Sequence, residues 1–121
     1  TVGAVAADGE RVAAATSTGG RWFALAGRVG DSPQIGSGFY ASPAGGASVT
    51  GAGEAIARRT VARTAVDYLE DGADPQTAAD RALSEFAAAT DSEAGLVVMD
   101  AEGEAGSAYN SEAMQTAVVD A

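Results

Sequence analysis

Two short runs of small and β-branched residues, residues 2–7 and 12–16, constrain the fold more than any other feature of this sequence. The four residues between them, Asp-Gly-Glu-Arg at 8–11, have turn chemistry, so the pattern predicts a β-hairpin. Both runs are apolar on both faces, which is typical of strands covered on each side. We therefore expect a layered fold with this hairpin at its centre and Thr1 at the start of a buried strand, in a cleft.

The next thirty residues, 17–46, are rich in Gly, Ser and Pro and show little apolar periodicity. A stretch of this kind and length predicts a long loop, and long ordered loops in compact domains are often functional. Within or just after it, residues 36–41 and 45–50 favour two short strands. Trp22 and Phe23 are expected to be hydrophobic anchors of this loop; the alternative is that they contact a substrate.

Two helices are predicted next. Apolar residues recur at helical spacing over residues 52–71, and Gly72 follows as a helix terminator. Asp74 and Pro75 then have the residue types preferred at the N-cap and first position of a helix, which we expect to run to about residue 89.

Three strand patterns complete the chain, at residues 96–100, 104–109 and 113–119. The order of elements is therefore strands, helices, strands, without a repeat or a low-complexity linker. This order predicts an α/β (α+β) domain in which helices cover a sheet.

Composition limits the chemistry. The 121 residues include no Cys and no His, which excludes disulfides, thiolate metal sites and His-based triads in this chain. Hydroxyls and carboxylates remain as reactive groups. Hydrophobic residues make up 46% of the chain but aromatic residues only 6%, so the core is thin for one domain and fits part of one.

Charge is unevenly distributed. The net charge is −10, and all seven cations are Arg. Only four of the 17 acidic residues lie in residues 1–60. Residues 61–121 therefore contain 13 acidic residues and only two arginines. This excess predicts a salt-adapted surface and argues against nucleic acid or an anionic membrane as partner. No apolar run reaches the roughly 18 residues of a membrane span, so the expected location is the cytoplasm. Two i,i+4 pairs, Glu54 with Arg58 and Arg63 with Asp67, are expected to serve solvation only.

Thr1 is the strongest candidate for catalysis. A threonine with a free α-amine carries a nucleophile and a general base on one residue. The alternative, that a chain numbered from Thr is a fragment and the residue is inert, is the more common situation for a terminal Thr considered alone.

Four motifs in order change that judgement; they are Thr-Val-Gly-Ala-Val-Ala at 1–6, Ala-Thr-Ser-Thr-Gly-Gly at 15–20, Gly-Arg-Val-Gly-Asp-Ser-Pro at 27–33 and Thr-Gly-Ala-Gly-Glu at 50–54. Together they resemble the β subunit of the plant-type L-asparaginases, or isoaspartyl aminopeptidases, of the N-terminal nucleophile hydrolase superfamily. The resemblance implies a four-layer αββα sandwich, with residues 1–121 as the C-terminal part of one domain that a separate α chain completes. It further implies a precursor that cuts itself before Thr1, an (αβ)2 heterotetramer, and no cofactor.

The resemblance also assigns roles to residues of the first three motifs. Thr18 corresponds to a threonine whose hydroxyl contacts the nucleophile, whereas Thr16 and Ser17 are expected to be structural. Arg28 is implied to bind the substrate α-carboxylate, which a guanidinium can grip with two hydrogen bonds, and Asp31 its α-ammonium.

The fourth motif is implied to form the oxyanion hole, from the Thr50 hydroxyl and the Gly51 N–H. Gly53 corresponds to a residue whose backbone contacts the substrate amine. Ala52 departs from the His or Asn common at its position, which puts the supporting hydrogen bonds in doubt.

The implied reaction is hydrolysis of L-asparagine and β-aspartyl dipeptides through a β-aspartyl ester on Thr1. Two alternatives stay open. A glycosylasparaginase would share the fold and Thr1, although Gly19 and Gly20 stand where that enzyme usually has Asn-Gly. A non-catalytic subunit that binds an amino acid would keep the fold without turnover.

Overall fold

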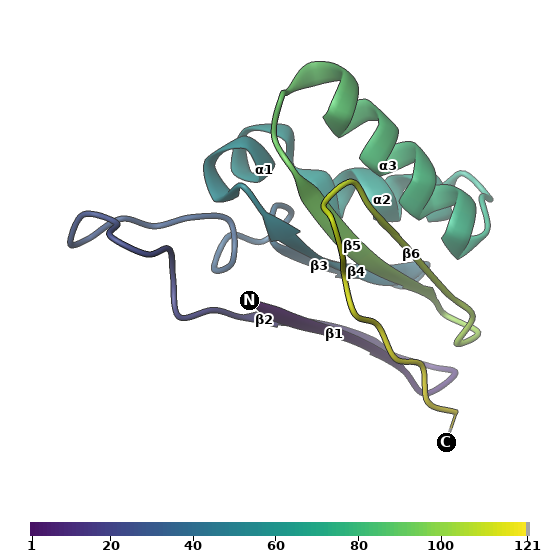
Figure 1. Ribbon diagram of the computed structural model, residues 1–121. Helices are drawn as coiled ribbons and strands as arrows, with labels where there is room; N and C mark the ends of the chain where they lie inside the picture. Colours follow the sequence, from purple (N-terminus) through teal and green to yellow (C-terminus); the bar gives the residue numbers. More distant parts are fainter. Residues whose placement is uncertain (121) are drawn as a thin grey trace.

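The computed structural model describes residues 1–120 and arranges them in three layers (Figure 1). Three helices lie on one face of a four-stranded antiparallel sheet, and a two-stranded hairpin lies against the other face. The elements, in chain order, are β1 (Val2–Ala7), β2 (Val12–Ser17), β3 (Phe39–Ser42), β4 (Gly45–Gly51), α1 (Gly53–Arg59), α2 (Val61–Glu70), α3 (Pro75–Ala89), β5 (Ala94–Asp100) and β6 (Ala105–Tyr109).

The predicted hairpin is confirmed. β1 and β2 pair antiparallel from Val2 opposite Ser17 to Ala7 opposite Val12, and the Asp8 carboxylate accepts hydrogen bonds from the backbone N–H groups of Glu10 and Arg11 in the turn. The larger sheet has the order β3-β4-β5-β6, so the two strands that follow the helices pair directly with those that precede them.

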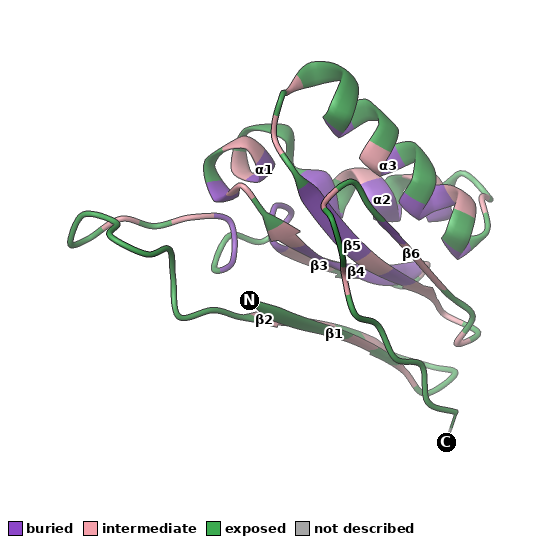
Figure 2. Ribbon diagram, in the orientation of Figure 1, coloured by how far each residue is buried: buried purple, intermediate pink, exposed green. Residues whose placement is uncertain are grey.

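Within residues 1–120 the hairpin is covered on one face only, so this chain alone does not supply the expected cover on both faces. β2 alternates between half-buried and exposed residues, the first three residues of β1 are all exposed, and Thr1 is exposed rather than buried (Figure 2). One face of the hairpin packs on β3, β4 and β5, while the described residues place nothing on the other. Residues 1–120 thus supply three layers of the predicted four-layer sandwich.

The core lies between the helices and the larger sheet. Val49 of β4, with Leu96 and Val98 of β5, projects toward the helices and is almost completely buried, as are Ile56 and Phe86 on the helical side. Alternate residues of a strand share one face, so these strands contribute every second side chain to this layer. The remaining core residues are largely alanines and valines, which lets the helices lie close to the sheet.

The single helix predicted over residues 52–71 is wrong, because the structure breaks it at Thr60. Thr60 adopts left-handed angles, φ 46° and ψ 52°, between α1 and α2. A turn from the preceding loop replaces the missing helical hydrogen bonds: the N–H groups of Ala62 and Arg63 donate to the carbonyls of Ser37 and Gly36. The Ser37 hydroxyl donates to the Ala57 carbonyl near the end of α1.

The other helix is confirmed as predicted. The Asp74 side chain accepts a hydrogen bond from the Thr77 N–H at 3.0 Å and caps α3, with Pro75 at its start. Hydrogen bonds from the Thr77 hydroxyl and the Thr77 N–H lower the pKa of Asp74. Neither this helix nor any other in residues 1–120 is long and apolar enough to cross a membrane.

The strand predicted at residues 113–119 is wrong. Asn110 ends the pairing of β6, because its backbone N–H donates to the Ala94 carbonyl and its side-chain oxygen accepts from the Ala94 N–H. Beyond it the chain leaves the sheet, and Met114 lies over Gly95. Residues 115–118 then line a hollow beside β1 and β5 without joining a sheet.

Trp22 and Phe23 do not anchor the long loop. Their side chains are 87% and 98% exposed, stack edge to face on each other, and meet no core within the described chain. Phe23 also has a positive φ of 59°. The loop that follows β2 extends away from the layered part of the molecule (Figure 1).

Candidate active site

The register of the hairpin brings Thr1 and Thr18 together. Because Val2 pairs with Ser17, the residue before β1 and the residue after β2 are neighbours at the same end. The Thr1 hydroxyl donates to the Thr18 hydroxyl oxygen at 2.9 Å. The Gly20 N–H donates to the same Thr18 oxygen at 3.1 Å and holds it in place. The structure therefore places the Thr18 hydroxyl against that of Thr1, which is the contact that the family resemblance implies.

Thr16 contacts the larger sheet and not Thr1, which agrees with the structural role predicted for it. Its hydroxyl donates to the Gly38 carbonyl at 2.9 Å and lies 2.6 Å from the hydroxyl of Ser48 on β4. These contacts tie the hairpin to the larger sheet and so fix the position of Thr1 above it.

Arg28 is held by Glu54, the last residue of the fourth motif. Its Nε and Nη2 donate to the two Glu54 carboxylate oxygens at 2.6 and 3.0 Å, a bidentate ion pair between the long loop and α1. The hydrogen bonds from Arg28 lower the pKa of Glu54 to about 2. The predicted pair of Glu54 with Arg58 is therefore wrong, because Glu54 points at the loop; the pair of Arg63 with Asp67 is confirmed at 3.0 Å.

Asp31 is the one carboxylate in the site that is buried, with 6% of its surface exposed. Its oxygen Oδ2 has no hydrogen-bond partner among the described residues. Burial raises the pKa of this carboxyl, although the Arg28 charge acts in the opposite direction. A buried carboxylate oxygen that lacks a donor is a suitable acceptor for a cationic group of a ligand.

Gly51 and Gly53 occupy positions where a side chain would not fit. Gly51 has φ 137°, and a Cβ there would lie 2.3 Å from the Glu93 carbonyl. A Cβ on Gly53 would lie 2.8 Å from Arg28 Nη2 and 3.1 Å from Asp31 Oδ1. Glycine at residue 53 thus lets the backbone at the start of α1 approach both charged side chains.

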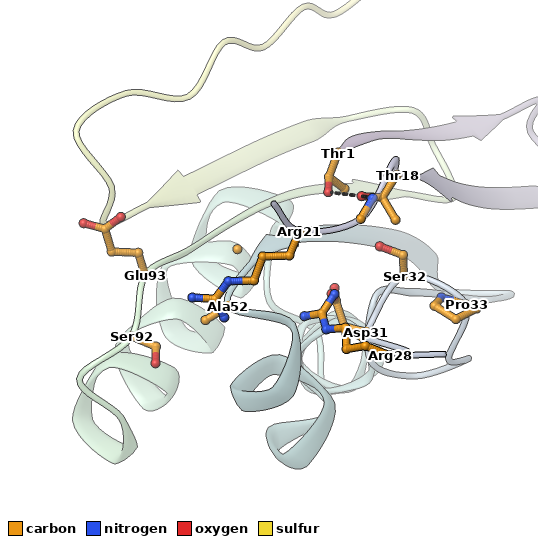
Figure 3. A pocket seen from close by; sticks show the side chains of 13 residues that line it. Thr1, Thr18, Arg21, Arg28, Asp31, Ser32, Pro33, Ala52, Ser92 and Glu93 are labelled. Atoms are coloured by element: carbon orange, nitrogen blue, oxygen red, sulfur yellow. Dashed lines mark hydrogen bonds between the residues drawn. The ribbon is translucent and has the colours of Figure 1, made fainter. Parts of the chain in front are cut away.

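A cavity of about 390 Å³ connects these groups (Figure 3). Of the predicted site residues it is lined by Thr1, Thr18, Arg28, Asp31 and Gly51. Thr50 does not line this cavity; it lines an adjoining hollow of about 180 Å³ that Thr1 also borders. Gly53 lies behind Arg28 and Asp31 and is buried.

The sequence did not single out four residues that take part in this site. Glu54 anchors Arg28, and Arg21, Ser92 and Glu93 line the cavity. Glu54 could have been found as the last residue of the fourth motif. Ser92 and Glu93 carry no sequence signal, since only the pairing of β4 with β5 brings them next to Gly51 and Ala52.

The layered helices and sheets, with a threonine hydroxyl at the open end of a hairpin, define this as an N-terminal nucleophile hydrolase fold. The chain belongs to the asparaginase family, whose sequence profile matches residues 1–121.

The names of two relatives agree with this assignment. The chain is 46% identical over 121 residues to the plant-type L-asparaginase of Thermococcus kodakarensis, covering 97% of this chain and 39% of that protein. It is 45% identical over 105 residues to the isoaspartyl peptidase/L-asparaginase of Danio rerio, covering 85% of this chain and 34% of the relative. The chain thus spans less than two fifths of the length of these relatives.

Proposed function

We propose that the protein is an amidohydrolase that cleaves the side-chain amide of L-asparagine and the isopeptide bond of β-aspartyl dipeptides. One observation carries the proposal: the Thr1 hydroxyl, hydrogen-bonded to Thr18, borders a cavity that also contains Arg28 and Asp31. The names of the relatives, plant-type L-asparaginase and isoaspartyl peptidase/L-asparaginase, support the same substrates.

Substrate binding follows from the two charged groups. Three of the five N–H donors of Arg28 remain after Glu54 has taken two, enough for the α-carboxylate of an aspartyl group. Asp31 supplies an acceptor for its α-ammonium, which would satisfy the unpaired Oδ2. A substrate presents both charged groups, the α-carboxylate and the α-ammonium, only when its aspartyl α-carboxyl and α-amine are free. In an ordinary α-peptide bond one of these groups is part of the bond, so we expect that such bonds are not cleaved.

The chemistry then proceeds at Thr1. Its Oγ attacks the β-amide carbon, and its free α-amine takes the hydroxyl proton and passes it to the leaving nitrogen. The C–N bond breaks, leaving a β-aspartyl ester on Thr1. Water attacks this ester with the same amine as base, and aspartate is released as the threonine oxygen regains a proton.

Charge on the amide oxygen must be stabilised during both steps. We assign this stabilisation to the Thr50 hydroxyl and the Gly51 N–H. Gly51 lines the main cavity and Thr50 lines the adjoining hollow, and Thr1 lines both. Loss of one such donor typically costs about 2.7–4 kcal/mol of transition-state stabilisation. The Gly53 backbone, close to Asp31, would contact the substrate amine.

The proposal requires a free amine on Thr1 and further polypeptide. We infer that a longer precursor cleaves itself before Thr1 by an N-to-O acyl shift. The upstream α chain would then complete the sandwich by covering the open face of the hairpin. From the resemblance to the plant-type L-asparaginases we further propose an (αβ)2 heterotetramer, located in the cytoplasm.

The test uses the full-length protein and its Thr1→Ala variant. Hydrolysis of L-asparagine, L-glutamine, a β-aspartyl dipeptide and a glycosylated asparagine is measured side by side. We expect turnover of asparagine and the dipeptide only, and an uncut, inactive polypeptide for Thr1→Ala. Preferred turnover of the glycosylated substrate would indicate a glycosylasparaginase, and no turnover by the mature protein would indicate a binding subunit.

A further inference from the structure

The catalytic cavity holds a second arginine that the reaction described above does not use. Arg21 follows the Thr18–Gly20 turn and lines the cavity together with Thr1. In Figure 3 its side chain extends across the cavity toward Ala52, on the side away from Ser32 and Pro33. The positive charge of Arg21 contributes to lowering the pKa of Glu54, so its guanidinium lies close enough to act on the site electrostatically.

The two arginines differ in what they contact. Arg28 is held by both oxygens of Glu54. Arg21 forms none of the ion pairs in residues 1–120 and no side-chain hydrogen bond there. Its five donors are therefore available to an anionic ligand, and guanidinium binds carboxylate bidentately.

The position of Arg21 decides which carboxylate it meets. An aspartyl substrate whose α-groups bind Arg28 and Asp31 directs its β-amide to Thr1, and the leaving group must then lie in the remaining part of the cavity. That part is lined by Arg21, Ser92 and Glu93. The leaving group of asparagine is ammonia, which carries no carboxylate, whereas that of a β-aspartyl dipeptide is an amino acid with a free α-carboxylate.

We propose that Arg21 binds the α-carboxylate of the leaving amino acid and so favours β-aspartyl dipeptides with a free C-terminus over asparagine. This inference rests on the proposed function of the site. Arg21 is a specificity residue: it acts on KM for one class of substrate and takes no part in the bond-breaking steps at Thr1.

The experiment compares three substrates with the full-length, processed protein: β-aspartyl-leucine, its C-terminal amide and L-asparagine. Variants are Arg21→Ala, Arg21→Lys and, as matched control, Arg59→Ala, which removes an exposed arginine at the end of α1 outside this cavity. Arg21→Ala should raise KM for β-aspartyl-leucine about three- to tenfold, the reduced effect expected of a solvent-exposed charge pair. It should leave kcat, and KM for the amide and asparagine, within about twofold. Arg21→Lys should restore part of the loss, and Arg59→Ala should change nothing.

Several results would overturn the inference. Wild-type protein that cleaves β-aspartyl-leucine and its amide with equal KM, or an Arg21→Ala variant that affects all three substrates alike, would show that Arg21 does not recognise the carboxylate. A lowered Tm together with uniform loss of activity would instead mark Arg21 as a contact to the rest of the protein. If wild-type protein cleaves none of the three substrates, the proposed function itself fails, and the inference with it.

Discussion

At the scale of single residues, the ion pair between Arg28 and Glu54 organises the site. It joins the long loop to the first turn of α1 and sets the plane of the guanidinium. Because Glu54 engages Nε and one N–H of Nη2, the N–H groups that remain on Nη1 and Nη2 form a fork for a second carboxylate. We therefore expect Glu54 to act as a positioning residue and Arg28 to be the group that touches the substrate.

A double-mutant cycle tests this division of roles. Arg28→Ala should lower kcat/KM for a β-aspartyl dipeptide by about ten- to a hundredfold, the usual range for lost charged hydrogen bonds. Glu54→Ala should have a smaller effect, mainly on KM, and adding it to Arg28→Ala should cost little more. Self-cleavage should survive in all three variants, and Asp67→Ala, which breaks the exposed pair with Arg63, is the control. Strictly additive losses would contradict a role of Glu54 through Arg28.

Asp31 gives a second prediction, on stability. Burial raises the pKa of its carboxyl above the ordinary value of 3.8, so at pH values between the two pKa values the folded protein holds a proton here that the unfolded chain has released. The stability linked to this group is therefore complete below pH 3.8 and is lost as pH rises through the raised pKa.

Asp31→Asn should consequently stabilise the substrate-free protein at pH 7 and raise its Tm. We expect the free energy of unfolding to increase by about 1 kcal/mol, the lower end of the cost of leaving a buried polar group without a hydrogen bond. The gain should vanish at pH values below 3.8. The same variant should lose most activity, because the substrate ammonium loses its charged partner. Melting curves from pH 3 to 8 decide the matter, and a variant less stable than wild type at pH 7 would refute the prediction.

At the scale of elements, the break between α1 and α2 is set by the loop that carries the site. Residues Gly36 and Ser37 replace the hydrogen bonds that a continuous helix would have made across Thr60. The loop is thereby fixed to the helical layer a few residues after Asp31. The left-handed conformation of Thr60, a β-branched residue, carries the strain of this arrangement.

Thr60→Gly should therefore stabilise the protein. Relief of left-handed strain contributes about 1–2 kcal/mol, and the greater freedom of glycine in the unfolded chain offsets about 0.4–1 kcal/mol. Thr64→Gly, the same change within α2, should instead destabilise, by about 0.3 kcal/mol from helix propensity and further through loss of the hydrogen bond from the Thr64 hydroxyl to the Thr60 carbonyl. Chemical denaturation of the two variants provides the measurement. If both substitutions destabilise, Thr60 is held by contacts that outweigh its strain.

At the scale of the whole molecule, charge divides the chain in two. The segment with the four motifs is nearly neutral, while residues 61–121 carry 13 acids and two arginines. Two of the helices and the last strands belong to this acidic segment, and most of its charged side chains are exposed. Their mutual repulsion opposes the compact state in dilute buffer.

Salt should relieve this repulsion, since the screening length falls from about 10 Å at 0.1 M to about 3 Å at 1 M. We expect both Tm and activity of the full-length protein to rise from dilute buffer into molar KCl. Sorbitol of equal osmolarity serves as the control for effects unrelated to charge. A flat or falling profile of Tm against KCl concentration would contradict the prediction of a salt-adapted surface.

Several features could be predicted from sequence because they depend on near neighbours. The hairpin requires only its two apolar runs and the turn between them, and the start of α3 requires only Asp74, Pro75 and the N–H of Thr77. The contact of Thr1 with Thr18 follows directly from the hairpin register. A short turn fixes this register, so the sequence determined these two partners by itself.

The tertiary structure decided whatever depends on a distant partner. Glu54 meets Arg28 across 26 residues, rather than Arg58 one turn away, because the loop passes over the start of α1. Residues 113–119 have the alternation of a strand but join no sheet, and Trp22 has the side chain of an anchor but meets no core. Periodicity describes what a segment can form; a hydrogen-bonding edge, an opposite charge or a core must be brought to it by the rest of the chain.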